Sequence, residues 1–506
     1  MNFFKIIFIL TIILLILLFI YLIKKLSHDY NIIQDNNKTY SQNYTYNPFK
    51  IVRDEIINKT NKTINLNANI SSNYNNTFNE NKKNETNRKL GIAFVYSSLF
   101  SNGIARFITV TAEYFLQTGK YDIYFITGKP YHKEFHFSDK IKRFIGHDNT
   151  SIIKNITKHY KIDFFILQNV LASSTIKWYK SLGSKIIGMF HGNYMSAMFL
   201  NDPLVYKRWN QFDLLDSFIF IAADDYYYYN HLNFKNHIFI PNLYTFEPSK
   251  MKSSNLTGHT IMMLGRENDK IKGAIYAVKA MTFIVKEVPD AILNIVTSDS
   301  RVQFLKNLTR DLNLTNNVKI LYHTYDISSH FYNSSVYLYT SLSEAFPMAM
   351  VEGKAHGMPI VAFDVPISPP YQKGVITVDS MDYEALARET VKLLKDYEYR
   401  KKMGELSKLS LDMFSNNETL EMWEKLFDVL NQGEEQYREF QREVQKKFYN
   451  EERARAHIEK HFRDVKRYNS NLSCFTVENF SNPYLVSQLK TCMEANKTGN
   501  VTSSNK

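Results

Sequence analysis

The stretch Ser341-Leu-Ser-Glu-Ala-Phe-Pro-Met-Ala-Met-Val-Glu-Gly-Lys-Ala-His-Gly-Met-Pro-Ile-Val-Ala-Phe363 decides how the rest of the chain is interpreted. It follows a short β-branched and aromatic run, Val336 to Tyr339, which is typical of a buried parallel strand. Pro347 can then open a helix, because its missing N–H would have no partner in the first turn. Gly357 and Pro359 predict the end of that helix, just before a second apolar strand. The pattern therefore indicates strand, loop, helix and strand in immediate succession.

Two carboxylates in this stretch, Glu344 and Glu352, are eight residues apart in the sequence. Both are predicted to lie near the helix N-terminus, where free N–H groups and partial positive charge suit a phosphate or sugar oxygen. A carboxylate is an acceptor with two oxygens, which match the two hydroxyl donors of a vicinal diol such as a ribose or hexose. The stretch therefore predicts a site for a sugar nucleotide.

The pattern Glu344-x7-Glu352, inside Ser-Glu-Ala-Phe-Pro and followed by Gly357-Met-Pro-Ile-Val, resembles the donor-binding signature of the family 4, or group 1, retaining glycosyltransferases. The resemblance implies an α/β chain of the GT-B fold, with two Rossmann-like parallel-sheet domains facing a cleft. The chain departs from the family at Ala345 and Pro347, where glycines are usual, and at Gly353, where alanine is usual. These departures bear on sugar specificity more than on the reaction class.

Length and composition indicate a globular chain of two or three domains. The 506 residues are 44% hydrophobic, enough for cores that need no covalent staples. The net charge of +12 suits anionic partners, yet the basic residues are interspersed with acidic ones, so solvated faces are favoured over nucleic-acid binding. No RNA-binding fingerprint or zinc-finger spacing is present, although a basic surface can steer a pyrophosphate donor.

The N-terminal residues 3–23 form an apolar run long enough to span a bilayer. Lys24 and Lys25 follow without a cleavage site, which favours an uncleaved anchor, and by the positive-inside rule they favour a cytosolic body. Against this, the chain holds about 18 Asn-x-Ser/Thr sequons where chance gives about six. We therefore predict a single-pass type II protein of the Golgi or endoplasmic reticulum with a luminal body. Whether Cys474 and Cys492 pair stays open, because a luminal compartment permits a disulfide and a cytosolic one leaves two thiols.

The pattern along the chain predicts five parts, and the resemblance implies the roles of the two Rossmann-like domains. The five parts are a cytosolic tail and anchor (1–25), a disordered glycosylated stem (26–89), an N-terminal Rossmann-like acceptor domain (90–243), a C-terminal Rossmann-like nucleotide-sugar domain (244–430), and a charged helical extension with a tail (431–506). The stem is rich in Asn, Lys, Thr and Ser and cannot bury enough surface to fold. Strands are predicted at 91–96, 121–127, 163–168, 185–190, 217–222 and 238–242, and in the second domain at 260–265, 291–296, 318–322, 336–339, 360–363 and 375–378.

Two candidate site residues fall in the first domain. Gly103, in the turn after the first strand, can let backbone approach a phosphate or sugar closely. His191, directly after a strand, can donate to a sugar hydroxyl or to developing charge. An ordinary tight turn and a structural cap are the alternatives for the two positions. The resemblance implies that the glycine faces donor and acceptor and that the histidine lies near the donor sugar.

The start of the second domain offers two cations. Gly265 and Arg266 end a strand, and Lys272 precedes a glycine at the start of a helix. Cations and free N–H groups at such a point suit a pyrophosphate, although an isolated Arg and Lys near a turn are usually surface residues. The family has a Gly-Arg…Lys-Gly element here. This chain has one extra residue between the cations, so Lys272 is preferred and Lys270 is the reserve.

The resemblance implies a retaining glycosyltransferase that moves a sugar from a nucleoside diphosphate sugar to a hydroxyl acceptor, on a glycan or glycoprotein. Glu352 would hold the ribose diol, Glu344 the transferred sugar, and Arg266 and Lys272 the leaving pyrophosphate. The sugar pocket would be lined by the peptide groups around Phe346, with Ala345 and Pro347. No metal or other cofactor is expected, because cations and a helix N-terminus replace an Asp-x-Asp metal motif. The alternatives are a membrane-anchored, non-catalytic glycan-binding protein on the same fold, and a phosphorylase or cytosolic lipid-glycosylating enzyme.

After the last predicted strand, helices are predicted up to residue 468. Trp423, Leu426, Phe427 and Leu430 mark a helix that, by the resemblance, crosses back to the first domain. The charged stretch 434–468 has apolar residues at helical spacing and predicts an amphipathic helix or helix pair. His457 and His461 are four residues apart and could share a metal, but no third ligand is evident and an exposed polar face is favoured.

Overall fold

The computed structural model describes residues 88–468, apart from 101, 131–133, 169–172, 194–208, 232–233, 266–271, 298–301, 323–326, 366–372 and 414. Chain contacts separate 1–76 from 77–506, and every described residue belongs to the second unit. The apolar run 3–23, nearly all of the predicted stem, both cysteines, Arg266 and Lys270 lie outside the described residues. Within them, no helix is long and apolar enough to cross a membrane.

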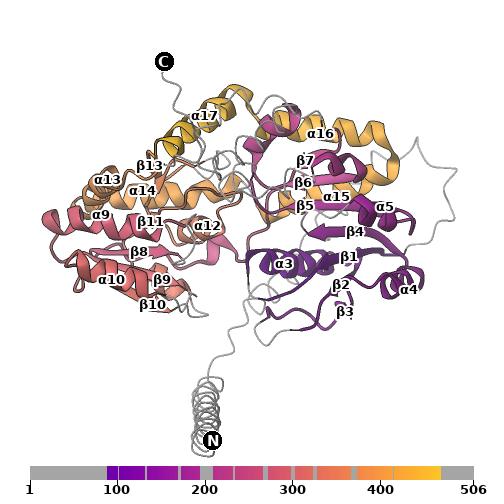
Figure 1. Ribbon diagram of the computed structural model, residues 1–506, viewed down its shortest axis with the longest axis horizontal. Helices are drawn as coiled ribbons and strands as arrows, with labels where there is room; N and C mark the ends of the chain where they lie inside the picture. Colours follow the sequence, from indigo (N-terminus) through magenta and orange to yellow (C-terminus); the bar gives the residue numbers. More distant parts are fainter. Residues whose placement is uncertain are drawn as a thin grey trace, which may run out of the picture. The chain divides into compact units, whose positions relative to one another are not determined.

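The first half of the described chain forms a seven-stranded sheet in which every strand pair is parallel (Figure 1). Its strand order is β3-β2-β1-β4-β5-β6-β7. The strands are β1 (Leu90–Tyr96), β2 (Tyr121–Thr127), β3 (Lys142–Ile145), β4 (Ile162–Gln168), β5 (Lys185–Phe190), β6 (Ser217–Phe220) and β7 (His237–Phe239). Six of them correspond to predicted strands. The prediction missed β3, because this edge strand is half exposed and carries no apolar run.

The first sheet is accompanied by α3 (Gly103–Gln117), α4 (Thr150–Tyr160), α5 (Ser173–Lys180), η1 (Trp209–Leu214), η2 (Ala223–Asp225) and α8 (Tyr226–His231). Helix α3 begins at Gly103 because the Asn102 side chain accepts a hydrogen bond from the Ala105 N–H, 2.9 Å away. The tyrosine run after β6 packs into the core: Tyr226, Tyr227 and Tyr229 are buried.

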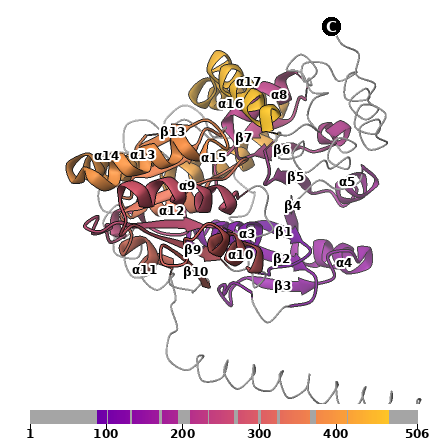
Figure 2. The same ribbon diagram turned by 60° about the vertical axis from the view of Figure 1, so that its left-hand side comes forward.

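The second half forms a six-stranded, all-parallel sheet in the order β10-β9-β8-β11-β12-β13. Its strands are β8 (Thr260–Leu264), β9 (Ile292–Thr297), β10 (Val318–Tyr322), β11 (Val336–Tyr339), β12 (Ile360–Phe363) and β13 (Val375–Val378). Its helices are η3 (Pro248–Lys250), α9 (Ala274–Glu287), α10 (Gln303–Asp311), α11 (Ile327–Tyr332), α12 (Met348–Ala355), α13 (Tyr383–Lys395), α14 (Tyr397–Leu409) and η5 (Ser410–Met413). Helices α9 and α13 pack together (Figure 2). All six predicted strands of this half are present.

Helix α12 differs slightly from its prediction at the start and agrees at the end. Pro347 is the N-cap, with φ −82° and ψ 65°, so the helix begins one residue later, at Met348. At the other end Gly357 has φ +62°, the left-handed conformation that ends helices and favours glycine. The strand–loop–helix–strand succession around Glu344 is therefore confirmed.

Helix α15 (Asn416–Gln432) returns to the first sheet, as the resemblance implies. The ring of Phe427 packs against Phe115 and Phe164, with centroids 5.6 and 4.7 Å apart, and Trp423 packs against Phe115 at 5.6 Å. Trp423 and Phe427 are both fully buried. Helix α15 therefore shares the core of the first sheet.

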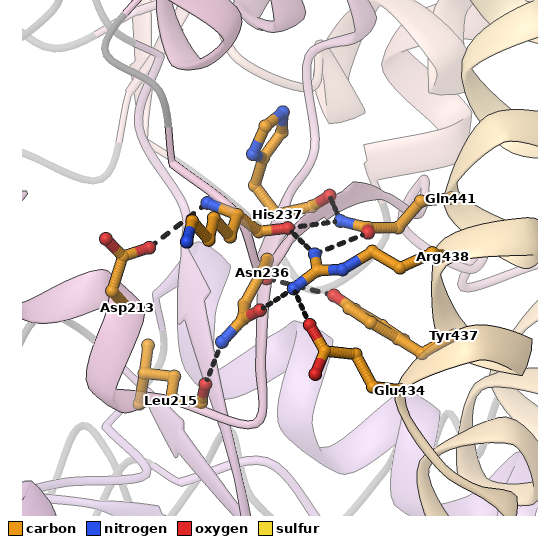
Figure 3. A network of polar contacts seen from close by, with 9 residues as sticks. Asp213, Leu215, Asn236, His237, Glu434, Tyr437, Arg438 and Gln441 are labelled. Carbon is orange, nitrogen blue, oxygen red and sulfur yellow. Dashed lines mark hydrogen bonds and ion pairs between the residues drawn. The ribbon is translucent and has the colours of Figure 1, made fainter.

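A polar network, shown in Figure 3, connects helix α16 (Glu434–Phe448) to the first residue of β7 and to the two residues before it. Arg438 donates to the carbonyl of Lys235 and, over 2.9 Å, to Asn236 Oδ1. Gln441 Nε2 donates to the carbonyls of Lys235 and His237, and Tyr437 Oη donates to the Asn236 carbonyl. Helix α17 (Glu451–Tyr468) follows α16 and is the last described element.

Candidate active site

Each described candidate residue follows a strand of its own parallel sheet. Gly103 begins α3, the helix after β1, and His191 directly follows β5. In the second sheet Gly265 directly follows β8, and Glu344 lies in the loop after β11. The carboxyl ends of parallel strands share one edge of a sheet, which is where open α/β sheets bind ligands. Topology therefore places these residues at the ligand-binding edges of the two sheets.

Lys272 and Glu344 form an ion pair. The Lys272 ammonium donates to Glu344 Oε1 over 2.6 Å, and the Glu344 side chain is 10% exposed. The pair is held by the start of α9: Gly273 has φ +65°, and a Cβ there would lie 2.3 Å from the Thr340 carbonyl oxygen. Only glycine fits this close approach, and Thr340 Oγ1 in turn donates to the Lys272 carbonyl. The end of β11 and the start of α9 thus bring these two candidate residues together.

Glu352 lies beside a cation that sequence reasoning missed. Arg106 Nη1, from the first turn of α3, is 2.5 Å from Glu352 Oε1, and Arg106 Nη2 donates to Thr245 Oγ1 over 2.5 Å. The Glu352 side chain is 9% exposed, and its Oε1 is buried without an aligned hydrogen-bond donor. The arrangement supplies a compensating charge but leaves acceptor capacity for a ligand hydroxyl. The available signal was the position of Arg106 three residues after Gly103, at the same sheet edge.

Asn193 also joins the two sheets and was missed. Its Nδ2 donates to the Glu344 carbonyl over 2.7 Å, and its Oδ1 accepts from Ser343 Oγ over 3.0 Å. The residue is buried, two positions after His191. The loop that carries Glu344 is therefore positioned by hydrogen bonds from the first sheet.

His191, directly after β5, has a polar partner, Gln168, on the neighbouring strand β4. Its Nε2 is 2.5 Å from Gln168 Oε1 at the end of β4, and its ring packs edge-on against Phe107, with centroids 5.0 Å apart. Burial lowers the pKa of His191 to about 3, so the imidazole is neutral at pH 7. Because Gln168 Oε1 can only accept, the single N–H of the neutral ring is at Nε2 and Nδ1 keeps a lone pair, so the ring does not contribute a positive charge.

The remaining candidates are two glycines and the loop before α12, and they differ in how tightly the protein packs around them. At Gly103 an added Cβ would meet no protein atom within 4 Å, so the fold does not require glycine. At Gly265 a Cβ would lie 2.8 Å from the Met263 methyl group, which is the flexible end of a side chain. Ala345, Phe346 and Pro347 are buried in the loop before α12. That loop is therefore a packed segment at the N-terminus of the helix.

No group of three His, Cys, Asp or Glu side chains that could hold a metal occurs in the part of the chain that the structure describes. The interpretation of His457 as part of an exposed face is wrong, since its side chain is 9% exposed and contacts two aspartates. The side chain of His461 is not described. A pocket of about 330 Å³ lies between β7 and α16, and none of the candidate residues lines it.

Two all-parallel sheets with candidate residues at their ligand-binding edges define the GT-B architecture, and solved structures agree. A glycosyltransferase from Rickettsia africae is 18% identical, with a TM-score of 0.55, over 68% of this chain and 100% of that one. WaaG, a glycosyltransferase involved in lipopolysaccharide biosynthesis, is 13% identical, with a TM-score of 0.53, over the same shares. At such low identity these likenesses establish the fold.

Residues 247–409 match the model of the family "Glycosyl transferases group 1". An uncharacterized glycosyltransferase of Haemophilus influenzae is 29% identical over 194 residues, which are 37% of this chain and 54% of that protein. The poly(glycerol-phosphate) alpha-glucosyltransferase of Bacillus subtilis is 26% identical over 184 residues, 35% of this chain and 27% of that protein. The chain thus spans about half the length of the first relative and about a quarter of the second. The match confirms, for this region, the resemblance to the group 1 glycosyltransferases that the sequence shows.

Proposed function

We propose that the protein transfers a sugar from a nucleoside diphosphate sugar to a hydroxyl acceptor, with retention of configuration and without a metal ion. The observation that carries the proposal is the state of Glu352: a buried oxygen without an aligned donor, beside Arg106. The diol of a ribose would supply two hydroxyl donors to this carboxylate.

The neighbouring groups suit the rest of such a donor. An ammonium has three N–H donors, so Lys272 can keep Glu344 and also contact a phosphate oxygen. Helix α9 starts beside it, and the N-cap residue Gly273 provides no side-chain hydrogen bond. The first N–H groups of α9 and the Lys272 charge, with Arg266, would stabilise the negative charge that develops on the leaving diphosphate. Glu344 would accept from hydroxyls of the transferred sugar.

The comparisons support a uridine nucleotide as the first donor to test. Anabaena HepE, whose structure was solved in complex with UDP and glucose, is 14% identical with a TM-score of 0.53 and covers 66% of this chain. The Bacillus subtilis relative is named for alpha-glucosyl transfer, which favours retention because the usual glucose nucleotides are α-linked. Metal independence stays a prediction for the chelator experiment described below.

We also propose a luminal, membrane-anchored protein that acts on a glycan or glycoprotein, supported by the apolar run 3–23 and the excess of sequons. Several sequon asparagines of the described body, among them Asn155, Asn313 and Asn417, are exposed and so accessible to glycosylation. Treatment with an endoglycosidase should reduce the apparent mass of the protein produced in eukaryotic cells. In sealed microsomes, the body of the protein should be protected from added protease. An unglycosylated, protease-sensitive body would contradict this orientation.

The decisive test is thermal stabilisation by nucleoside diphosphates and nucleotide sugars, with a chelator present, on wild type and Glu352→Ala. A ligand at 100 times its Kd stabilises a protein by about 2.7 kcal/mol, which is a shift of several degrees in Tm. We expect a selective shift in wild type that Glu352→Ala loses. Glu405→Ala, on the exposed face of α14, is the matched control and should keep the shift.

Two other outcomes would change the conclusion. A shift that appears only when a divalent metal replaces the chelator would contradict metal independence and leave the donor site in place. No shift with any nucleotide, in protein whose circular dichroism shows that it is folded, would contradict the transferase proposal. A shift with free glycans alone would then favour the glycan-binding alternative.

A further inference from the structure

Helix α17 contacts both sheets through charged side chains. Arg453 Nη2 is 3.4 Å from Asp224 Oδ1, in η2 after β6 of the first sheet. Lys460 pairs with Asp364, directly after β12 of the second sheet, and its Nζ is 3.1 Å from Asp379 Oδ1, after β13. Ala454 and Ile458 of the same helix are buried. A single helix therefore carries cations to carboxylates that belong to different sheets.

His457 makes both connections with one ring. Its Nδ1 is 3.4 Å from Asp224 Oδ2 and its Nε2 is 2.9 Å from Asp364 Oδ1. A neutral imidazole has one N–H and can donate to one carboxylate, whereas an imidazolium can donate to both. The bridge between the two aspartates therefore requires the charged form of His457.

The surroundings of His457 favour that charged form. Burial lowers its pKa, but the hydrogen bonds to Asp224 and Asp364 outweigh this effect and raise the pKa to about 9. Burial opposes the charged form of Asp364 too and so raises its pKa. The hydrogen bonds from His457 and Lys460 outweigh this effect and hold the pKa of Asp364 at about 2. The charged and titratable groups that face the bridge are Asp224 from η2, Asp364 and Asp379 from the second sheet, Arg453 and Lys460 from α17 itself, and the phenol of Tyr449 between α16 and α17.

The two bridged aspartates lie next to the candidate active site in the topology. Asp224 follows β6, which pairs with β5, and His191 directly follows β5. Asp364 follows β12, which pairs with β11, the strand that leads to Glu344. The bridge thus joins the edges of the two sheets that hold the two halves of the site.

We propose that His457 is a positioning residue: through Asp224 and Asp364 it makes α17 a strap that fixes the spacing of the donor and acceptor halves of the site. The effect on catalysis rests on the proposed function, whereas the effect on the spacing of the sheets does not. Group transfer between two bound reactants is sensitive to their alignment, and a displacement of about 1 Å can slow a reaction on the order of 100-fold. Release of the strap should therefore lower kcat more than it weakens donor binding.

The experiment measures the distance between the two sheets by double electron–electron resonance. Spin labels are attached at Lys154→Cys, exposed on α4, and Lys401→Cys, exposed on α14, in the full chain with Cys474→Ser and Cys492→Ser. His457→Gln removes the charged bridge. Arg455→Gln is the matched control, because Arg455 is exposed on the same helix and forms its ion pair with Glu459 of that helix, at 2.7 Å.

We expect a narrow distance distribution for wild type and Arg455→Gln at pH 7, and a broader one with longer distances for His457→Gln. Because the folded-state pKa of His457 lies above its ordinary value of 6.5, its contribution is complete below that pH and is lost as the pH rises through about 9. The wild-type distribution should therefore broaden across pH 8–10, and that of His457→Gln should not change. His457→Arg, which keeps several donors and a permanent charge, should show the narrow distribution at pH 7 and across pH 8–10.

Kinetics give the second readout. If the protein transfers sugar, His457→Gln should lower kcat about tenfold while the nucleotide-induced shift in Tm is kept, since Lys272, Glu344 and Glu352 all lie in the half of the chain that forms the second sheet. Distance distributions that are the same for His457→Gln and Arg455→Gln would overturn the proposal, whatever the enzyme activity. Asp364→Asn tests the same bridge from the other side should His457→Gln not fold, and an unchanged distribution there would also overturn it. Loss of every nucleotide shift in wild type would instead overturn the proposed function and leave the distance result standing.

Discussion

Two glycines near the candidate site are present for different physical reasons. Gly273 is required by the fold itself, because its backbone is left-handed and a Cβ would collide with the carbonyl of Thr340. Gly103 has ordinary backbone dihedrals and open space where a Cβ would be. Since no protein atom demands glycine at Gly103, only a ligand that approaches the first turn of α3 would make it necessary.

This reasoning gives a prediction for Gly103→Ala. Replacing glycine by alanine at a compatible position stabilises a protein by about 0.4–1 kcal/mol, so Tm should stay the same or rise slightly. Sugar transfer should fall at least tenfold if donor or acceptor contacts the backbone there. Gly258→Ala, on an exposed loop with no atom closer than 4.0 Å, is the control and should keep full activity. Full activity in Gly103→Ala would remove Gly103 from the site.

At the scale of elements, the packing of α12 on β11 explains one departure from the family. Gly353 stands where the family usually has alanine, and a Cβ there would lie 2.6 Å from Cδ1 of the Tyr337 ring. Tyr337 is fully buried on β11 and also packs against Phe331, with ring centroids 5.5 Å apart. The large side chain of Tyr337 on β11 therefore requires a small residue at position 353 of α12, the helix that carries Glu352.

Gly353→Ala should consequently destabilise the protein by roughly 1–3 kcal/mol, the usual effect of adding a methyl group to a packed core. The displacement of α12 should also weaken nucleotide binding through Glu352. Tyr337→Val alone should destabilise by leaving a cavity, but the double variant should be more stable than the sum of the two effects predicts, because each change relieves the other. Urea midpoints of the four proteins give this comparison, and strict additivity would contradict the packing argument.

At the scale of the whole molecule, two buried cations should shape the pH dependence of stability in opposite directions. His457 is stabilised in its charged form, as described above. Lys354 on α12 is fully buried, and its ammonium donates to the Lys373 carbonyl and to Ser410 Oγ, neither of which is charged. Burial lowers the pKa of Lys354 to about 7. The unfolded chain therefore binds more protons at this residue than the folded one between pH 7 and pH 10.5.

Stability rises with pH wherever the unfolded state binds more protons, so Lys354 should raise the free energy of unfolding by a few kcal/mol across that interval. Lys354→Met lacks the titrating group. The urea midpoint of wild type should therefore rise relative to that of this variant when the pH is increased from 7 to 10. Lys402→Met, exposed on α14, should show a constant difference. A constant difference for Lys354→Met as well would mean that the buried amine does not titrate in this range.

Local sequence accounts for the elements and for part of the site. Short continuous apolar runs predicted twelve of the thirteen described strands, because strands buried on both faces need apolar residues throughout. The strand β3 was missed because it is a half-exposed edge strand. The spacing of Glu344, Glu352 and Lys272 predicted a donor site, since strand ends of a parallel sheet share an edge. The described contacts bring Lys272 and Glu344 together, whereas Arg266 lies outside the described residues.

Only the tertiary structure decided what faces these residues across the chain. Arg106 beside Glu352, Asn193 on the Glu344 carbonyl and His457 between two aspartates each join positions separated by more than ninety residues. A sequence pattern reports what a residue does for its own helix or strand, because periodicity reflects burial within one element. Ion pairs between elements depend on how two sheets and the last helices pack, and that packing is set by the sum of many buried contacts. The sequence by itself therefore determined the family resemblance, all the described strands but β3, and the two carboxylates. The tertiary structure decided the partners of those carboxylates and the place of α17.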